Sequence, residues 1–233
     1  MVTFVKIEGK TVKGVFEHRL TRFSALVKVG DKTLQAFLPN PGRVHELLTP
    51  RVEVVLREVL SEKRKTSYDL IGVYHKDQKV SVDSRVPNKL VLEALRKKEL
   101  QEFSQYNLVK PEHLYGNSRF DFLLSDGYEH CLLEVKSCTL VKDGVAMFPD
   151  AETKRGRRHV QDLLKAKKEG YRACILFIIQ RTDANVLSPN DEADPEFGKV
   201  LRHAASQGIE VYAYCSEFVK SKIILQGKVK IEL

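Results

Sequence analysis

The chain has 233 residues, of which 42% are hydrophobic. This composition is sufficient for a large buried core and argues against intrinsic disorder. Lys and Arg outnumber Asp and Glu by 39 to 31, a formal net charge of +8, which favours a polyanionic partner such as nucleic acid, although many basic proteins bind no polyanion.

Residues 1–84 have the pattern of a small β-barrel. Strands are predicted at residues 24–29, 32–38, 52–59 and 68–75. Gly30 and Asp31 predict a two-residue hairpin turn between the first two of these strands. Residues 39–48 (PNPGRVHELL) predict a turn and one short helix. A β-meander with a short helix before its later strands is typical of a five-stranded OB barrel, and an SH3-like barrel would give the same pattern.

From residue 85 onward the pattern changes to that of a mixed α/β domain, which we expect to span residues 85–233. Helices are predicted at 88–103, 153–169 and from 195 to near Gly208, and strands at about 107–113, 118–124, 131–138, 172–180 and 209–215. Residues 172–180 are almost continuously apolar, as in a strand buried on both faces. Asp194 followed by Pro195 predicts a helix start. Residues 185–193 predict a polar loop and residues 222–233 a terminal hairpin.

The cysteines lie at positions 131, 138, 174 and 215, in or beside apolar segments, and none forms a C-x-x-C pair. We therefore expect buried free thiols in a reducing compartment rather than disulfides or zinc ligands. The N-terminal segment lacks the long apolar run of a signal peptide, and no run in the chain is long enough to span a membrane. These features predict a cytoplasmic protein with no membrane partner.

Three ionisable residues interrupt the hairpin predicted over residues 120–137. Glu134 and Lys136 are two apart on its second strand and therefore project from one face. With a four-residue turn over 126–129, Asp121 on the first strand lies directly opposite Glu134, and a two-residue turn keeps it on the same face. Two carboxylates placed close together repel unless a cation joins them, and Mg²⁺ is commonly held by one or two carboxylates, water and phosphate oxygens.

The spacing therefore predicts a Mg²⁺ (or Mn²⁺) site with Asp121 and Glu134 as ligands. Lys136 would complete a catalytic set for phosphodiester hydrolysis by neutralising phosphate charge and positioning the attacking water. Asp followed by Glu-x-Lys, on a hairpin between two helices, resembles the restriction-endonuclease-like nuclease core. The first motif of that core usually has proline before the aspartate, where this chain has Phe120. The alternative interpretation is a surface ion pair.

Two further side chains are candidates for this site. Glu93, on the first predicted helix, could add a metal ligand, and Gln161, on the helix after the hairpin, could face the site. For both residues a solvated position on the helix surface is the simpler interpretation.

Basic residues gather in two places where they could contact DNA. One group surrounds the start of the helix after the predicted site, where N–H groups of the helix terminus also attract phosphate. The predicted DNA contacts are Arg19, Arg22, Arg43, Lys154, Arg155, Arg157 and Arg158, and the run 63–65 is a further candidate. Phe23 could stack on a base or belong to the core.

The chain contains, in order between residues 19 and 160, the stretches RLTRFSALV, LPNPGRVHELL, RKTSYDL, PNKLVLEAL, SRFDFLL, LEVKSCTLV and MFPDAETKRGRRH. In these stretches it resembles the sugar fermentation stimulation protein A family. The resemblance implies an OB-like barrel joined to a nuclease-like domain, sequence-tolerant DNA binding and a role in regulating sugar (maltose) utilisation. It also implies that Asp121, Glu134 and Lys136 are the nuclease-type triad, and it places the family signature at Thr153, Arg155, Gly156 and His159.

Two functions from different classes are consistent with these features. One is a Mg²⁺-dependent nuclease acting on double-stranded DNA without strong sequence preference. The other is a non-catalytic DNA-binding regulator of sugar-utilisation genes, built on an inherited nuclease fold. A third and weaker option is an RNA-binding barrel protein. The complete Asp121, Glu134 and Lys136 set favours the nuclease, and the sequence leaves the oligomeric state open.

Overall fold

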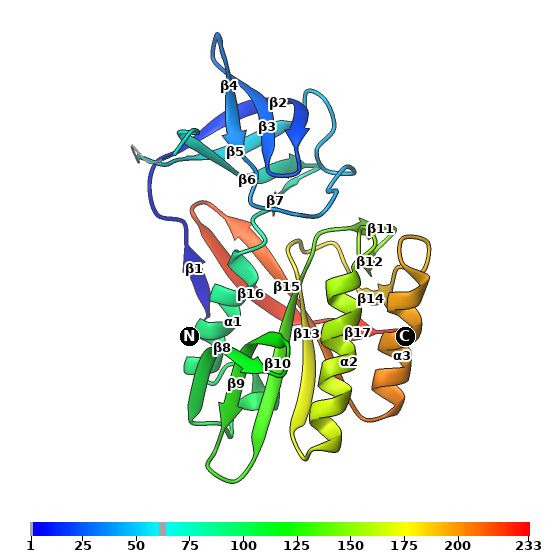
Figure 1. The fold of residues 1–233 in the computed structure, drawn as a ribbon. Helices are drawn as coiled ribbons and strands as arrows, with labels where there is room; N and C mark the ends of the chain where they lie inside the picture. Colours follow the sequence, from blue (N-terminus) through cyan, green and yellow to red (C-terminus); the bar gives the residue numbers. More distant parts are fainter. Residues whose placement is uncertain (1, 61–63) are drawn as a thin grey trace.

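The computed structural model describes residues 2–60 and 64–233, which form a β-barrel at one end of a larger α/β domain (Figure 1). The barrel strands are β2 (Thr11–Thr21), β3 (Ser24–Val29), β4 (Lys32–Phe37), β5 (Glu53–Glu58), β6 (Tyr68–His75) and β7 (Gln78–Ser81). They pair in the order β4-β3-β2-β5-β6-β7, and an additional pairing of β4 with β6, at Phe37 and Asp69, closes the barrel. The closed barrel confirms the predicted OB-like fold.

The barrel differs from the prediction between β4 and β5. The expected short helix is a single turn, in which Leu48 donates its backbone N–H to the carbonyl of Val44. Val44 has a φ of +51°, a left-handed conformation that a right-handed helix cannot contain. The segment therefore turns once and continues to β5 as a loop.

The α/β domain contains three α-helices among its described residues, α1 (Val86–Arg96), α2 (Lys154–Lys168) and α3 (Pro195–Ser206). Its strands are β1 (Phe4–Lys6), β8 (Leu108–Tyr115), β9 (Ser118–Ser125), β10 (His130–Cys138), β11 (Val141–Lys142), β12 (Val145–Phe148), β13 (Arg172–Ile179), β14 (Val186–Pro189), β15 (Glu210–Val219), β16 (Lys222–Lys228) and β17 (Lys230–Ile231). None of the helices in the described residues combines the length and apolarity needed to cross a membrane.

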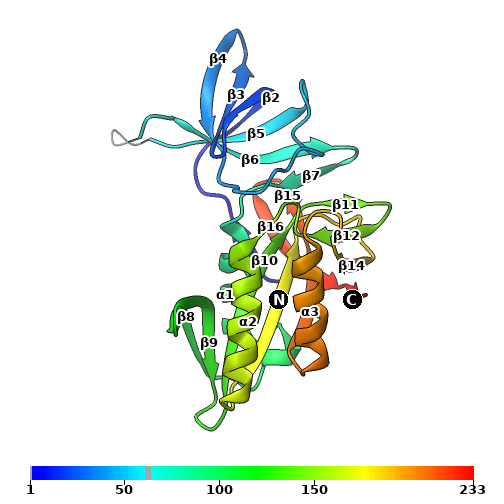
Figure 2. The same cartoon turned by 45° about the vertical axis from the view of Figure 1, so that its right-hand side comes forward.

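The main sheet of this domain has seven strands in the order β1-β16-β15-β13-β10-β9-β8. Its centre is parallel, because β13 pairs in parallel with both β10 and β15. Helix α1 packs on one face of the sheet, and α2 and α3 lie side by side on the other (Figures 1 and 2). Seven of the eight residues of β13 are buried, as its apolar sequence predicts for a strand covered on both faces. The mixed α/β class is confirmed, and the four cysteines are buried free thiols.

Four details of this domain differ from the sequence prediction. The predicted boundary at residue 84 places β1 in the barrel, but β1 pairs with β16 at the edge of the main sheet. The first helix ends at Arg96 rather than at 103, because Lys98 has a φ of +56°; a separate 3-10 turn covers Gln101–Phe103. The predicted loop 185–193 contains β14, which pairs with β12. The terminal strands form no hairpin with each other, since β16 pairs with β15 and β17 with β14.

Asp194 anchors the starts of both α2 and α3, and its side chain is 1% exposed. Its carboxylate accepts the N–H of Phe197 at 2.9 Å, the N-cap bond of α3 that the sequence predicts. It also accepts the backbone N–H of Thr153, the N-cap of α2, at 2.8 Å, and a 2.6 Å bond from the guanidinium of Arg157. Asp194 therefore fixes the end of α2 that faces the barrel.

We expect Asp194→Ala to lower the free energy of unfolding by about 3 kcal/mol, because it removes a helix cap and leaves a half-buried arginine without its buried partner. The measurement is urea denaturation followed by circular dichroism. Asp191→Ala is the matched control, since it breaks an exposed 2.6 Å ion pair with Arg202 and should cost less than about 1 kcal/mol. Equal losses in the two variants would contradict the anchoring role of Asp194.

Candidate functional site

The site is formed where β9 and β10 separate. Their antiparallel register runs from Ser125 opposite His130 to Phe122 opposite Leu133, which is the register given by a four-residue turn. The next pair would be Asp121 with Glu134, but β10 continues alone beside β13. The Asp121 carboxylate takes the place of the missing strand partner and accepts the backbone N–H of Val135 at 2.7 Å.

Glu134 is 4% exposed and has cationic and polar partners on one of its two oxygens. Oε1 accepts a bond from the Lys136 ammonium and a 2.5 Å bond from Nδ1 of His159. Nε2 of His159 accepts a bond from Nε of Arg155 at 3.3 Å, so the ring hydrogen lies on Nδ1 in this network. Burial raises the pKa of Glu134, but Lys136 and His159 outweigh it, so the net pKa is below its ordinary value. Oε2 is buried and has no hydrogen-bond partner.

The pKa of Asp121 is shifted in the opposite direction, above its ordinary value. Burial raises the pKa of this carboxyl and the neighbouring Glu134 carboxylate raises it further, to about 6, against the opposing effects of the Val135 N–H and Lys136. The amide of Asn88, in the first turn of α1, donates a hydrogen bond to Oδ1. The two carboxyl groups therefore lie close enough to interact, with α1 supporting one and α2 the other.

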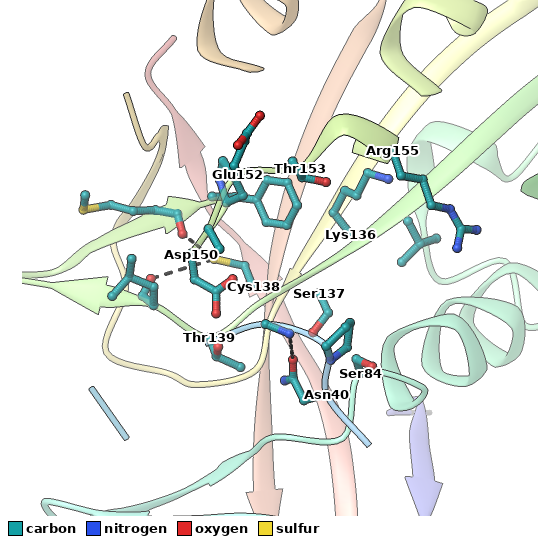
Figure 3. Close-up of a pocket in the computed structure, with 18 of the residues that line it drawn as sticks. Asn40, Ser84, Lys136, Ser137, Cys138, Thr139, Asp150, Glu152, Thr153 and Arg155 are labelled. Atoms are coloured by element: carbon teal, nitrogen blue, oxygen red, sulfur yellow. Dashed lines mark hydrogen bonds between the residues drawn. The ribbon is translucent and has the colours of Figure 1, made fainter. Parts of the chain in front are cut away.

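The site opens into a cleft between the two domains that encloses about 360 Å³. Figure 3 shows Lys136 and Arg155 on one side of this cleft, Asp150 on the opposite side, and Asn40 and Ser84 entering from the barrel and the interdomain segment. Asp150 accepts the N–H of Val44 at 3.1 Å. A Cβ at Gly42 would lie 2.5 Å from an Asp150 oxygen, so only glycine allows the barrel loop to approach this closely.

Arg19, predicted to contact DNA, has a different role. Its guanidinium donates all five of its N–H groups to backbone carbonyls: those of Thr21, Arg22, Asn40, Gly42 and Arg43. No N–H remains for a phosphate. Arg19 instead holds the barrel loop 40–43 that forms one wall of the cleft, and we withdraw it from the predicted DNA contacts.

Arg157 is also occupied by structural contacts. It forms ion pairs with Asp194 at 2.6 Å and with Glu152 at 2.7 Å, and its side chain is 20% exposed. The remaining predicted cations are exposed, namely Arg22, Arg43, Lys154, Arg155 and Arg158. Arg22 and Arg155 line the cleft itself. In the run 63–65, Lys63 lies outside the described residues.

Of the predicted accessory residues, two make contacts at or next to the site and two lie on the helix surface. Thr153 accepts the N–H of Gly156 at 3.0 Å as the N-cap of α2, and His159 contacts Glu134. Gln161 is exposed on α2, two positions from His159 and therefore on another side of the helix. Glu93 pairs with Arg96 at 3.4 Å on the surface of α1. The helix residue that reaches the site is Asn88, five positions before Glu93, and sequence reasoning missed it.

The site residues fit an oxygen-preferring divalent ion. Glu134 offers a buried oxygen without a hydrogen-bond partner. The neighbouring cations and hydrogen-bond donors do not fully compensate the negative charge of Asp121, and its pKa is raised. Among residues 2–60 and 64–233 there is no group of three or more His, Cys, Asp or Glu side chains that could hold a metal. An ion at this point would complete its coordination with water or phosphate oxygens, as Mg²⁺ commonly does.

The fold and site define a two-domain protein that joins an OB barrel to a restriction-endonuclease-type domain. Two family models match the chain: the SfsA N-terminal OB domain at residues 18–82 and the sugar fermentation stimulation protein RE domain at residues 85–222. The chain belongs to the sugar fermentation stimulation protein family.

Curated relatives extend the match to nearly the whole chain. Sugar fermentation stimulation protein homologs from Thermoanaerobacter pseudethanolicus and Caldanaerobacter subterraneus are 44% and 45% identical, over 97% of this chain and 99% of theirs. A solved structure of SfsA from Pyrococcus furiosus, in complex with Ca²⁺, has a TM-score of 0.92 and 26% identity over the full length of both chains.

We expect Asp121→Asn to stabilise the metal-free protein at pH 8 and to have about half that effect at pH 5. The raised pKa means that the folded state holds this proton more tightly than the unfolded chain. The stabilisation from the bound proton is complete below the unfolded pKa, near 4, and is lost as pH rises through about 6. Replacing the ionised group at pH 8 should therefore raise the free energy of unfolding by on the order of 2 kcal/mol.

The measurement is urea denaturation in EDTA at both pH values. Asp31→Asn, at an exposed hairpin turn, is the control and should change neither. An Asp121→Asn effect of the same size at pH 5 and pH 8 would show that the buried charge is not its origin.

Proposed function

We propose that this protein binds DNA and hydrolyses phosphodiester bonds with a divalent ion held by Asp121 and Glu134. The observation that carries the proposal is a buried and a half-buried carboxyl group between β9 and β10: Glu134 has an unpartnered oxygen and Asp121 has a raised pKa. Two such groups are costly to keep in a fold unless a cation joins them. Ca²⁺, present in the Pyrococcus furiosus SfsA complex, takes oxygen ligands as Mg²⁺ does, which supports an oxygen-ligated divalent ion in this chain.

The side chains around the carboxylates have distinct tasks in this proposal. A bound Mg²⁺ or Mn²⁺ would supply Lewis-acid stabilisation of charge on the phosphate. Lys136 lines the cleft and would neutralise a phosphate oxygen and position the attacking water. His159 donates to Oε1 of Glu134 and keeps the carboxylate oriented, and Arg155 holds the other ring nitrogen of His159.

Exposed cations on both domains would hold the DNA backbone. Arg22 and Arg43 lie on the barrel side of the cleft, and Lys154, Arg155 and Arg158 lie at the start of α2. The first turn of α2 adds the partial positive charge of a helix N-terminus. Contacts of this kind recognise phosphate and carry no sequence information, which agrees with sequence-tolerant binding.

We expect Glu134→Gln and Lys136→Ala to abolish divalent-dependent DNA cleavage while leaving DNA affinity within a few-fold of wild type. The affinity comes from many phosphate contacts, whereas these two groups act on one scissile phosphate. The measurements are a cleavage time course in Mn²⁺ on single-stranded, duplex and branched DNA, and a gel shift in EDTA.

The matched control for Glu134→Gln is Glu93→Gln, on the exposed side of α1, which should cleave as wild type does. A wild-type protein that binds but cuts none of these substrates would refute the nuclease and favour the alternative, a non-catalytic DNA-binding regulator of sugar utilisation. Loss of binding in EDTA by both site variants would instead make the carboxylate pair an element of recognition or folding.

We expect DNA affinity to fall steeply with salt, and the double variant Lys154→Gln, Arg158→Gln to fall less steeply. Each phosphate contact that is lost should reduce the slope of log affinity against log salt by about 0.9. Lys168→Gln is the control, because this exposed lysine lies on the same helix, about 20 Å from its N-terminal end. Titrations by fluorescence anisotropy at several salt concentrations give the slopes. An identical reduction in the control variant would remove the start of α2 from the DNA-binding surface.

A further inference from the structure

Two phenylalanines form a stacked pair on the surface of the barrel. The rings of Phe23 and Phe37 have centroids 6.4 Å apart and planes inclined by 24°. Phe23 is the outer ring and is 44% exposed. A single exposed phenylalanine needs no explanation, but an outward-facing ring supported from behind by a second ring presents a flat, rigid apolar surface. Nucleic-acid bases stack on aromatic surfaces of this kind.

Three arginines lie beside this pair, and a buried carboxylate holds two of them in place. The guanidinium of Arg22 lies 5.5 Å from the centre of the Phe23 ring, and those of Arg64 and Arg85 lie 5.4 and 5.8 Å from that of Phe37. Arg64 and Arg85 both bind the fully buried Asp69. Fixed cations beside an aromatic surface suit the alternating bases and phosphates of a nucleic-acid strand.

The location on the barrel agrees with this chemistry. Phe23 lies in the turn between the first two barrel strands, Phe37 ends the third, and Arg64 lies in the connection between β5 and β6. A groove of about 430 Å³ runs between these residues. The loops between the first and second strands and between the fourth and fifth strands, here β2–β3 and β5–β6, are those through which OB folds bind oligonucleotides.

The aromatic pair is continuous with the interdomain cleft. Three chain segments contribute to both places: Phe23 follows Arg22, Phe37 precedes Asn40 by three residues, and Arg85 follows Ser84. Arg22, Asn40 and Ser84 all line the cleft that contains Glu134 and Lys136. A strand held on the rings would therefore lead directly to the carboxylate site.

We infer that the Phe23–Phe37 pair binds unpaired bases of DNA and directs that strand into the cleft, so that the substrate class is DNA with a single-stranded segment. This inference rests on the proposed function and revises the sequence-based expectation of a continuous duplex. In a duplex the base faces are covered by neighbouring bases, and an aromatic ring cannot stack on them unless the base is exposed. A cleft of about 360 Å³ has the size of a site for one small ligand, which accommodates one nucleotide.

The test is fluorescence anisotropy in EDTA with a labelled thymidine oligonucleotide, a labelled hairpin duplex and a fully abasic oligomer. Phe23→Ala should weaken binding of the thymidine oligonucleotide about tenfold or more. It should leave the duplex and the abasic oligomer unchanged, and Phe23→Trp should retain wild-type affinity. Phe4→Ala is the matched control, because Phe4 is 37% exposed on β1 with Lys97 and Lys222 over its ring.

Four outcomes would overturn the inference. They are an unchanged affinity of Phe23→Ala for the thymidine oligonucleotide, an equal loss for duplex and single strand, an equal loss in Phe4→Ala, and tighter binding of the matching RNA oligomer. Thermal melting of each variant checks that the barrel is intact. Because these measurements need neither metal nor cleavage, a protein that fails to cut DNA can still pass them. Failure here leaves the Glu134 and Lys136 cleavage test unaffected.

Discussion

The burial of the Glu134 carboxylate is the constraint on which the rest of the site depends. A carboxylate that is 4% exposed stays ionised only when cationic or hydrogen-bonding partners replace its water. Lys136 comes from the same strand, but His159 comes from α2 and is useful only if that helix is held over the sheet. Asp194 fixes the start of α2, and β13 supports β10 beyond the end of its pairing with β9. The Glu134 site therefore requires both the β10–β13 pairing and the anchoring of α2.

The barrel is joined to this site through backbone groups rather than through a large apolar interface alone. Arg19 binds the carbonyls of loop 40–43, and Asp150 of the α/β domain binds the N–H of Val44 in the same region. Loop carbonyls and N–H groups that would otherwise need water are satisfied from both domains. The wall of the cleft opposite Lys136 is therefore held at a fixed position, although it consists of a connection between strands.

The sequence predicted those parts of the structure that depend on local pattern. The hairpin register around Asp121, the buried strand 172–180 and the Asp194 helix cap all follow from spacing and residue type. The strands β1 and β14 were missed because three or four residues are too few to show a period. Asn88 and Asp121 are 33 positions apart, and nothing in either segment alone indicates their contact. An arginine such as Arg19 has the same sequence pattern whether it binds phosphate or carbonyl groups.

The charge distribution around the cleft implies an order of events if the proposed function holds. Exposed Arg22 and Arg155 line the cleft together with Glu134, and a phosphate drawn in by those cations would meet the Glu134 carboxylate, with Asp121 close behind it. Without a metal ion this encounter is repulsive, and with one it is attractive. A divalent ion and a DNA strand would then each raise the affinity for the other by the same factor, as thermodynamic linkage requires. Arg22 and the ring of Phe23 could hold a strand beside the cleft in either state, because neither depends on the metal. In this arrangement DNA would bind beside the cleft with or without the ion, and only the entry of the strand into the carboxylate site would depend on the ion.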